Sequence, residues 1–398
     1  MQYIKPNGLI YRIAQGVSWV VAKVIFRRVL LRDEIRDLKG PFVVIANHQS
    51  KLDFVNLIGV CKRPMSFVIS KSFYRTLPIT GILRRMGVIP KQQFQTTVAD
   101  MKKMKSVIDH GQPLVIYPAG LMCEDGLSTP IPKATYKFLK WLDADVYVAR
   151  SYGTYFVMPK WAKNIRPGKT YMDVYKLFSK EELKELSVEQ VQEKADEALL
   201  FDAYREQERI QTSYSDDIEG LENVLYLCPH CHKEFTIKVK NKNTLYCDSC
   251  GYELVSDNKG FLRNDCGFGP DIRYVSDWSK LIFEEQKNAI LNQPELRLET
   301  PVQILMINEK KHKFCPVGQG ILSLKDAVFD FAGVVNGQQT QMHLPVTSIP
   351  TLPFTPGKHL EIQQGDVIYR CVPQEGRLVT KLINMVKIFH QLSLSKTA

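Results

Sequence analysis

The chain has 398 residues, 44% of them hydrophobic, and 53 Lys and Arg against 42 Asp and Glu give a formal net charge of +11. This length allows two or three domains, and the composition is typical of a folded protein that is soluble or attached to a membrane surface. No run of 18 uncharged apolar residues occurs, so the sequence predicts no membrane-spanning helix. Cations interrupt the apolar N-terminal stretch, so we also expect no signal peptide.

The charge is divided unevenly along the chain. Residues 1–178 carry 28 Lys and Arg against 11 Asp and Glu, a net +17, whereas residues 179–398 carry 25 against 31, a net −6. The basic part indicates an anionic partner, which could be a phospholipid membrane, a phosphorylated substrate, an acidic carrier protein or nucleic acid. The nine cysteines include two CxxC pairs, which favours metal binding in a reducing compartment over a disulfide framework.

Residues 8–31 are rich in Leu, Ile and Val, with Arg12 near one end and Arg27, Arg28 and Arg32 near the other. An apolar middle with cations at both ends suits a helix that lies in the membrane interface, with its long side chains reaching the headgroups. An ordinary amphipathic helix packed on its own domain explains the pattern equally well. Both interpretations stay open.

A histidine stands where a predicted strand ends and a predicted helix begins. The apolar run Phe42–Ala46 predicts a buried strand, and a helix is expected from Phe54 to Val60. In open α/β sheets reactive groups gather at the ends of the strands. His48 lies at this point, and the carboxylate of Asp53 is close enough in sequence to hold its imidazole as a general base.

A structural role explains the same residues. Ser50 and Asp53 fit a capping box, in which the serine caps the helix and the acid three residues later returns to the serine's backbone. Spacing alone favours capping slightly over catalysis, and the two roles are compatible. A helix that begins just after His48 would favour its neutral form.

Strands and helices then alternate, as expected for a mostly parallel sheet. The predicted strands cover 65–69, 114–117, 146–149 and 171–177, and the predicted helices cover 97–109 and 135–142. Ser179 and Ser187 open capping boxes that predict helices in the acidic stretch 180–209. We therefore expect an α/β domain over residues 1–215.

Two cysteine pairs predict a zinc ribbon over residues 223–262. Fifteen residues separate the pairs, which are Cys228 with Cys231 and Cys247 with Cys250. Four thiolates at this spacing suit tetrahedral Zn²⁺, and because they fill its coordination sphere we expect the metal to be structural. His230 and His232 lie beside the first pair and are weaker alternatives as ligands.

The last part of the chain changes character. A helix is predicted over 277–292, within an expected helical linker at 263–297. Residues 298–398 then show about seven short predicted strands followed by an amphipathic helix from Leu378 to Phe389. This order resembles a pleckstrin-homology-like domain in architecture, although another small β domain fits nearly as well.

Three short blocks of the first domain carry a family resemblance. The first is Asn47-His48-Gln49-Ser50-Lys51-Leu52-Asp53, which matches the pattern NHxxxxD. A looser second block runs from Lys71 to Lys91, and a third is Tyr117-Pro118-Ala119-Gly120-Leu121-Met122. Through these three blocks, the first part of the chain, about 180 residues long, resembles the glycerolipid acyltransferase family, the lysophosphatidic acid acyltransferases.

The resemblance implies a mechanism and a set of site residues. His48 would deprotonate a glycerol hydroxyl that attacks the thioester of acyl-CoA or an acyl carrier protein, Asp53 would hold the imidazole, and no acyl-enzyme would form. Lys71 would stabilise the tetrahedral oxyanion. The residues expected to bind substrate are Asn47, Ser50, Lys91, Gly120 and Lys133.

The third block departs from the family pattern Phe-Pro-Glu-Gly-Thr-Arg. Its glutamate and arginine, which help to position the acceptor in the family, are Ala119 and Met122 here. Lys91 stands where the family usually has arginine, and as a point charge it would bind the acceptor phosphate less specifically. A phosphate site built from Lys91 and Lys133 would be one compensation.

Three functions follow as hypotheses. The first is an O-acyltransferase that converts a lysophospholipid such as 1-acylglycerol-3-phosphate to phosphatidic acid, cytoplasmic and attached peripherally to the inner face of the cell membrane. The second is a lipid- or partner-binding protein that keeps the acyltransferase fold without activity. Nucleic-acid binding through the zinc ribbon is less favoured, because residues 179–398 are acidic in sum.

Overall fold

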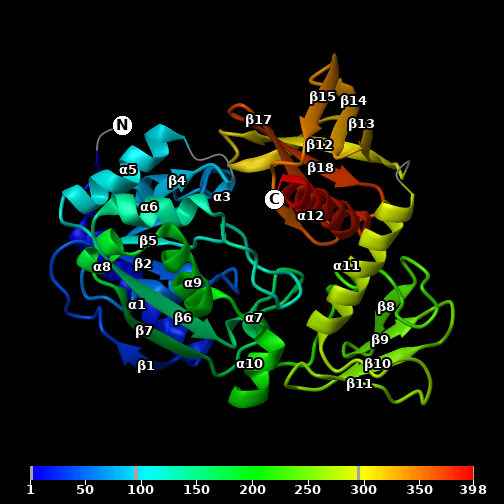
Figure 1. The fold of residues 1–398 in the computed structure, drawn as a ribbon, viewed down its shortest axis with the longest axis horizontal. Helices are drawn as coiled ribbons and strands as arrows, with labels where there is room; N and C mark the ends of the chain where they lie inside the picture. The colour runs from blue at the N-terminus through cyan, green and yellow to red at the C-terminus, as the bar shows by residue number, and fades with distance from the viewer. Residues whose placement is uncertain (1–2, 94–96, 294–295, 398) are drawn as a thin grey trace. The chain divides into compact units, whose positions relative to one another are not determined.

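In a computed structural model, residues 3–93, 97–293 and 296–397 of the chain are described (Figure 1). The chain divides into two compact units. Unit 1 consists of Met1–Lys160 and Asn164–Ser215, and unit 2 consists of Trp161–Lys163 and Asp216–Ala398.

Unit 1 is built on a seven-stranded sheet. Its strands are β1 (Val29–Asp33), β2 (Phe42–Ala46), β3 (Ser66–Ser70), β4 (Ile89–Lys91), β5 (Leu114–Ile116), β6 (Asp145–Tyr152) and β7 (Tyr171–Phe178), in the spatial order β1-β7-β6-β2-β5-β3-β4. The strands β2 to β6 run in one direction. Strand β7 is antiparallel to β6, and β1 runs parallel to β7. The expected mostly parallel α/β sheet is therefore confirmed.

Helices cover both faces of this sheet. They are α1 (Gly8–Val24), α2 (Asp53–Ile58), α3 (Lys71–Thr76), α4 (Thr80–Arg85), α5 (Val98–Asp109), α6 (Ala134–Leu142), α7 (Thr154–Val157), α8 (Lys180–Glu185), α9 (Val188–Leu199) and α10 (Ala203–Ile210). Successive side chains of a strand point to opposite faces. Val43 and Ile45 of β2 accordingly pack with apolar residues of α5, α6 and α9, whereas Phe42 and Val44 pack with residues of α1, α2 and α4.

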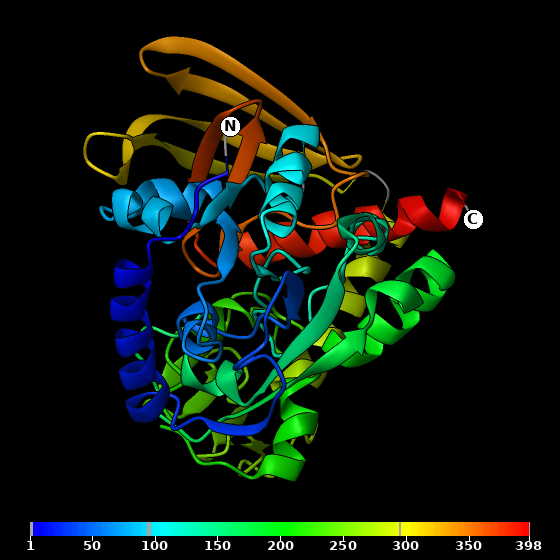
Figure 2. The ribbon, with the colours of Figure 1, turned by 90° about the vertical axis from the view of Figure 1, so that its left-hand side faces the viewer.

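The N-terminal helix is shorter than its apolar pattern predicts. A helix is expected over 8–31, but α1 ends at Val24, Arg27 has a left-handed φ of 41°, and Val29 begins β1. The expected boundary is therefore wrong, because Val29–Asp33 pairs with β7 and extends the sheet. Figure 2 shows α1, in dark blue, as a straight helix within unit 1. Among the described residues, no helix is both long and apolar enough to cross a bilayer.

The predicted helix caps have different outcomes. Ser179 and Ser187 each accept a hydrogen bond from the third helical residue, whose side chain returns the bond, so both capping boxes are confirmed. The capping box expected at Ser50 forms only in part: the Asp53 carboxylate accepts the Ser50 backbone N–H over 2.8 Å, but the Ser50 hydroxyl accepts from the Leu52 backbone over 3.5 Å and not from that of Asp53. Helix α2 begins at Asp53 with Leu52 at its N-cap and no side-chain cap, because the Asp53 carboxylate bonds to His48 and to the backbone before the helix.

Unit 2 contains a small antiparallel sheet. Its strands are β8 (Ile237–Lys240), β9 (Thr244–Cys247), β10 (Glu253–Ser256) and β11 (Leu262–Arg263), in the order β11-β10-β9-β8. A 3₁₀ turn at Leu221–Asn223 precedes it. The CxxC turns that flank β8 and β9 bring two distant parts of the sequence together.

A second sheet in unit 2 has seven antiparallel strands, in the order β15-β14-β13-β12-β18-β17-β16. They are β12 (Leu298–Asn308), β13 (Lys313–Lys325), β14 (Val328–Val335), β15 (Gln338–Pro345), β16 (Phe354–Thr355), β17 (His359–Gln364) and β18 (Val367–Pro373). Helix α12 (Leu378–Thr397) packs against this sheet, with Val379, Leu382 and Ile383 fully buried. The expected β-rich region with a C-terminal helix is confirmed, and its likeness to a pleckstrin-homology domain stays a prediction.

Helix α11 (Val275–Asn292), expected within a linker, is part of the packed interior of unit 2. Trp278 is fully buried and donates its indole N–H to the Leu227 carbonyl over 2.9 Å. Gln286 accepts from the Tyr226 hydroxyl and donates to the Lys381 carbonyl of α12. The helix therefore joins the segment that precedes the first cysteine pair to α12.

Candidate active site

The ends of five parallel strands meet at one edge of the unit 1 sheet. Ala46, Ile116 and Ser70 end β2, β5 and β3, which are neighbours in that order. Tyr117 and Lys71 follow the ends of β5 and β3 directly, and His48 is the second residue after β2. This is the edge at which ligands bind in open α/β sheets.

His48 and Asp53 form the hydrogen-bonded pair that the sequence predicts. Nδ1 of His48 lies 2.9 Å from Oδ2 of Asp53, and the two side chains are 22% and 2% exposed. The same Oδ2 atom accepts the backbone N–H groups of Gln49 at 2.7 Å and Ser50 at 2.8 Å. With Nδ1 committed to the carboxylate, Nε2 is the ring nitrogen left to take a proton.

Of the four residues 47–50, three are buried and only His48 is partly exposed. Asn47 exchanges two hydrogen bonds of 2.8 Å with the backbone of Ser151, and Gln49 accepts from the Thr154 hydroxyl at 3.0 Å and the Tyr155 backbone at 3.2 Å. These bonds anchor the loop on both sides of the histidine. The imidazole is the side chain that the loop presents outward.

Residues 151–160, which we call the anchoring segment, contact both the first and the third block, the latter through a hydrogen bond of 3.4 Å from Lys160 to the Met122 carbonyl. Besides holding Asn47 and Gln49, this segment accepts a long hydrogen bond of 3.5 Å from the Ser50 hydroxyl at the Met158 carbonyl. At its far end, Nζ of Lys160 lies 3.8 Å from Oε2 of Glu124, and both side chains are at least nine-tenths buried. Sequence reasoning missed this segment, because its position depends on β6 lying next to β2.

Asn47 and Ser50, expected to bind substrate, are both buried and bonded to the anchoring segment. Gly120, also expected there, turns the third block with a φ of 72°, a conformation that favours glycine. Its carbonyl accepts a hydrogen bond of 2.6 Å from the Gln93 side chain. Their contact with a substrate stays a prediction.

The three lysines occupy different surroundings. Lys71 is the first residue of α3 and is partly buried, two strands from β2 and hence about 10 Å along the sheet edge. Lys91 ends β4, three strands away at about 14 Å. Burial lowers the pKa of Lys91, although Asp100 nearby raises it in part.

Lys133 lies at the start of α6 and is exposed, near Glu189 on α9. Because α6 packs over one face of the sheet, Lys133 does not follow a strand end as His48 and Lys71 do. The structure thus groups Lys71 and Lys91 with His48 along one edge and gives Lys133 a different setting. A phosphate site shared by Lys91 and Lys133 stays a prediction.

The four cysteines of unit 2 converge. Their sulfur atoms all lie within 4.8 Å of one another, and the Sγ atoms are 3.7 Å apart for Cys228 with Cys250 and for Cys231 with Cys247. A tetrahedron with metal–sulfur bonds of about 2.3 Å has edges of about 3.8 Å, so this arrangement fits zinc. His230 lies 3.5 Å from the Cys250 sulfur through Nδ1, and His232 pairs with Glu285 at 2.9 Å.

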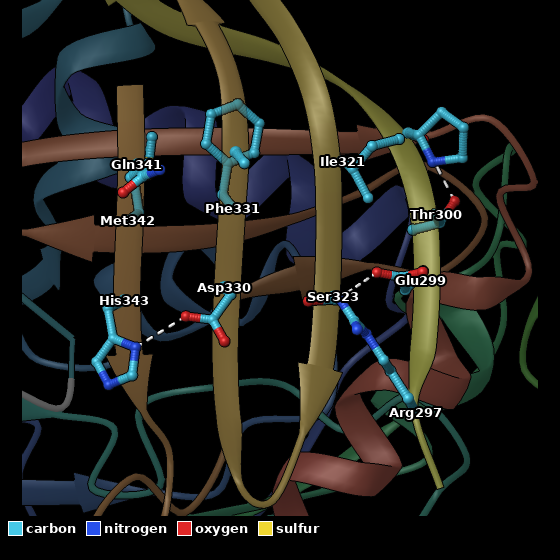
Figure 3. Close-up of a pocket in the computed structure, with 12 residues that line it drawn as sticks. Arg297, Glu299, Thr300, Ile321, Ser323, Asp330, Phe331, Gln341, Met342 and His343 are labelled. Atoms are coloured by element: carbon cyan, nitrogen blue, oxygen red, sulfur yellow. Dashed lines mark hydrogen bonds and ion pairs between the residues drawn. The ribbon is translucent and has the colours of Figure 1, made fainter. Parts of the chain in front are cut away.

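A hollow of about 710 Å³ lies on the outer face of the seven-stranded sheet in unit 2 (Figure 3). His343 and Asp330 are hydrogen-bonded over 2.8 Å across β15 and β14, and Arg297 forms an ion pair with Glu299 on β12. The charged side chains that line this hollow thus pair with one another. They do not form the cluster of cations that an anionic ligand would need.

Comparisons with known proteins bear on unit 1. Residues 27–159 match the family model described as Acyltransferase. Among solved structures, the chain is similar to the crystal structure of the 1-acyl-sn-glycerophosphate (LPA) acyltransferase PlsC from Thermotoga maritima, at 17% identity and a TM-score of 0.43, covering 50% of this chain and 79% of that one. No curated protein sequence matched the chain. Unit 1 thus carries an acyltransferase-like α/β domain with a mostly parallel sheet.

Proposed function

We propose that the protein transfers a fatty acyl group from an acyl thioester to the free hydroxyl of a lysophospholipid, with 1-acylglycerol-3-phosphate as the acceptor and phosphatidic acid as the product. The observation that carries this proposal is the pairing of His48 with Asp53 at the edge of the sheet. The pair leaves Nε2 free of the carboxylate, on a side chain that is 22% exposed between buried neighbours. The match of residues 27–159 to the Acyltransferase family model supports the reaction class.

The reaction proceeds by direct transfer. Nε2 of His48 takes the proton of the acceptor hydroxyl as its oxygen attacks the thioester carbonyl, forming a tetrahedral intermediate. Asp53 stabilises the imidazolium that results. The C–S bond then breaks, the thiolate leaves, and it takes the proton from His48. The products are an ester and a free carrier thiol, and the enzyme is never acylated.

Two lysines provide positive charge along the same edge. Lys71 would stabilise the oxyanion of the intermediate, and Lys91, farther from His48, would hold the acceptor phosphate. Their estimated spacing of about 5 Å, one strand apart, is short enough for a glycerol phosphate to bridge. The thioester would come from acyl-CoA or acyl carrier protein, the second of which is acidic enough to suit the basic residues 1–178.

The substrates are amphiphiles, and α1 offers a surface that could meet a membrane. Leu9, Ile13, Val17, Val20 and Val24 recur every three or four residues, and each is at least half exposed. Trp19 is exposed beside them, as are Arg12 and Lys23. An apolar stripe flanked by cations suits the interface of an anionic leaflet, so we propose peripheral attachment to the inner face of the cell membrane from the cytoplasm.

Vesicles test this attachment. Val17→Asp should weaken binding to phosphatidylglycerol vesicles at least fivefold in flotation, because a charge enters the apolar stripe. Val98→Asp is the matched control, since Val98 is 67% exposed at the start of α5, outside the stripe. Equal binding of both variants and wild type would exclude α1 as the membrane contact.

We also propose that the four cysteines of unit 2 bind one structural Zn²⁺. The fit of the Sγ···Sγ distances to a tetrahedron supports the metal, and four thiolates leave no position for a substrate. Reduced thiols at this site are consistent with a cytoplasmic protein. Unit 2 would then act in docking or regulation.

A non-catalytic lipid-binding protein is the second candidate, and Ala119 and Met122 in the third block are the residues that favour it. An assay separates the two candidates. Purified protein with radiolabelled acyl thioester and lysophosphatidic acid should form phosphatidic acid with the acyl-CoA or the acyl carrier protein donor. Binding of the lysolipid without any product would favour the second candidate.

A further inference from the structure

Tyr117 lies against the catalytic histidine. It follows β5, which pairs with β2 through Ile45 and Ile116, so the residues just after the two strands are neighbours. The rings of Tyr117 and His48 have centroids 4.6 Å apart and planes inclined by 35°. The family resemblance has phenylalanine at this position, so this chain adds a hydroxyl group beside the histidine.

That hydroxyl is buried and has no hydrogen-bond partner among the described residues. The Asp53 carboxylate has a matching atom. Its Oδ2 atom accepts three hydrogen bonds, whereas Oδ1 is buried and accepts none from the described part of the chain. Leaving a polar group buried without a partner costs about 1–3 kcal/mol. The Tyr117 hydroxyl can donate a hydrogen bond, and Oδ1 of Asp53 can accept one.

The two groups are also close enough to interact electrostatically. Burial raises the pKa of Tyr117 well above its usual value, and the negative charge of Asp53 raises it further. The phenol therefore stays protonated at any pH suitable for an assay. The phenol is thus a neutral donor within electrostatic range of a carboxylate whose Oδ1 atom accepts no hydrogen bond from the described residues.

We propose that the Tyr117 hydroxyl donates a hydrogen bond to Oδ1 of Asp53, directly or through one water molecule, and that Tyr117 is a positioning residue for the His48–Asp53 pair. This inference rests on the proposed function. A carboxylate held through both oxygens cannot turn about its own axis, so Oδ2 stays aligned with Nδ1 of the imidazole. Tyr117 acts through Asp53 and does not touch the substrate.

Tyr117→Phe is the direct test, because it removes the hydroxyl and keeps the ring against His48. We expect kcat to fall roughly tenfold, the effect of losing a hydrogen bond to a charged group, with KM for both substrates within about twofold. The acid limb of the plot of kcat against pH should also move to higher pH. Without the Tyr117 hydroxyl, the Asp53 carboxylate has one hydrogen-bond donor fewer and stabilises the His48 imidazolium more strongly. Tyr11→Phe, another buried tyrosine of the same apolar cluster, should change none of these.

A stability cycle tests the inference without activity. Tyr117→Phe should lower the melting temperature of the wild type, but not that of Asp53→Ala, in which the hydroxyl has lost its acceptor. A kcat of Tyr117→Phe within twofold of wild type, or equal shifts of melting temperature in both backgrounds, would overturn the inference. If wild type transfers no acyl group, the proposed function fails, and the stability cycle still decides whether Tyr117 and Asp53 interact.

Discussion

A single carboxylate oxygen of Asp53 hydrogen-bonds to the His48 ring and to the backbone of the two residues that follow it. Oδ2 lies 2.9 Å from Nδ1 of His48 and accepts the backbone N–H groups of Gln49 and Ser50. One carboxylate thus fixes the orientation of the imidazole and the conformation of the backbone that presents it. Substitution of Asp53 should affect both catalysis and stability.

Asp53→Asn should lower kcat about 10²- to 10⁴-fold, because a neutral amide neither stabilises the imidazolium nor selects the required tautomer. It should also destabilise unit 1 by about 1–3 kcal/mol, since the backbone donors lose a charged acceptor. Steady-state kinetics and chemical unfolding measure the two effects. Asp202→Asn is the control, because Asp202 is the N-cap of α10 and asparagine caps equally well. An Asp53→Asn enzyme with wild-type kcat would remove the carboxylate from the mechanism.

Acceptor binding should weaken at alkaline pH if Lys91 holds the phosphate. Burial lowers the pKa of Lys91, so in the free enzyme the ammonium loses its proton at a lower pH than an exposed lysine does. The positive charge is present below that pKa and lost as pH rises through it, and KM for lysophosphatidic acid should rise accordingly. Lys91→Arg should extend tight binding to higher pH, because guanidinium stays charged. If KM for lysophosphatidic acid rises at the same alkaline pH in wild type and in Lys91→Arg, Lys91 is not the phosphate ligand.

The buried pair of Lys160 and Glu124 should behave as a structural unit. Lys160→Met removes the cation that lies 3.8 Å from the buried Glu124 carboxylate and should cost about 3–5 kcal/mol of unfolding free energy. The double variant Lys160→Met with Glu124→Leu should recover most of that loss, because no charge remains buried. Lys180→Met, which breaks an exposed pair with Asp143, should change stability little. Failure of the double variant to recover would mean that Glu124 is held by other groups.

Purified protein should contain one zinc ion per chain. A chelator, or the substitution Cys247→Ser, should remove the metal and lower the melting temperature of unit 2, because four thiolates join segments far apart in sequence. Cys266→Ser is a matched control, since Cys266 lies in unit 2 outside the cluster. Metal analysis and calorimetry of these proteins test the site. Full zinc content in Cys247→Ser would show that a different set of ligands binds the metal.

Local patterns were sufficient for much of unit 1. The run Phe42–Ala46 is apolar at every position and forms β2 with those bounds, because a strand buried on both faces needs no polar residue. The same holds for the capping boxes of α8 and α9, which depend on residues three apart. The pairing of His48 with Asp53 also spans only five residues. Each of these features is decided by neighbours in the chain.

Features that depend on distant parts of the chain could not be predicted from local patterns. Residues 29–33 continue the apolar pattern of α1 but form a strand, because β7 provides a hydrogen-bonding edge. Ser50 has the sequence of a helix cap, but only the half of the capping box in which Asp53 accepts the Ser50 N–H forms, and α2 begins at Asp53. The contact of Tyr117 with His48 requires the order of β5 and β2. Only the knowledge that β5 lies next to β2 in the sheet would have suggested it.

The most direct test of the proposed function is the rate of phosphatidic acid formation by wild type and His48→Ala under identical conditions. Labelled acyl thioester, lysophosphatidic acid and mixed vesicles provide the reaction, and His110→Ala, which removes an exposed histidine of unit 1, provides the control. We expect a rate for His48→Ala at least about a thousandfold below wild type, with His110→Ala unchanged. A His48→Ala rate equal to that of wild type would contradict the proposed mechanism.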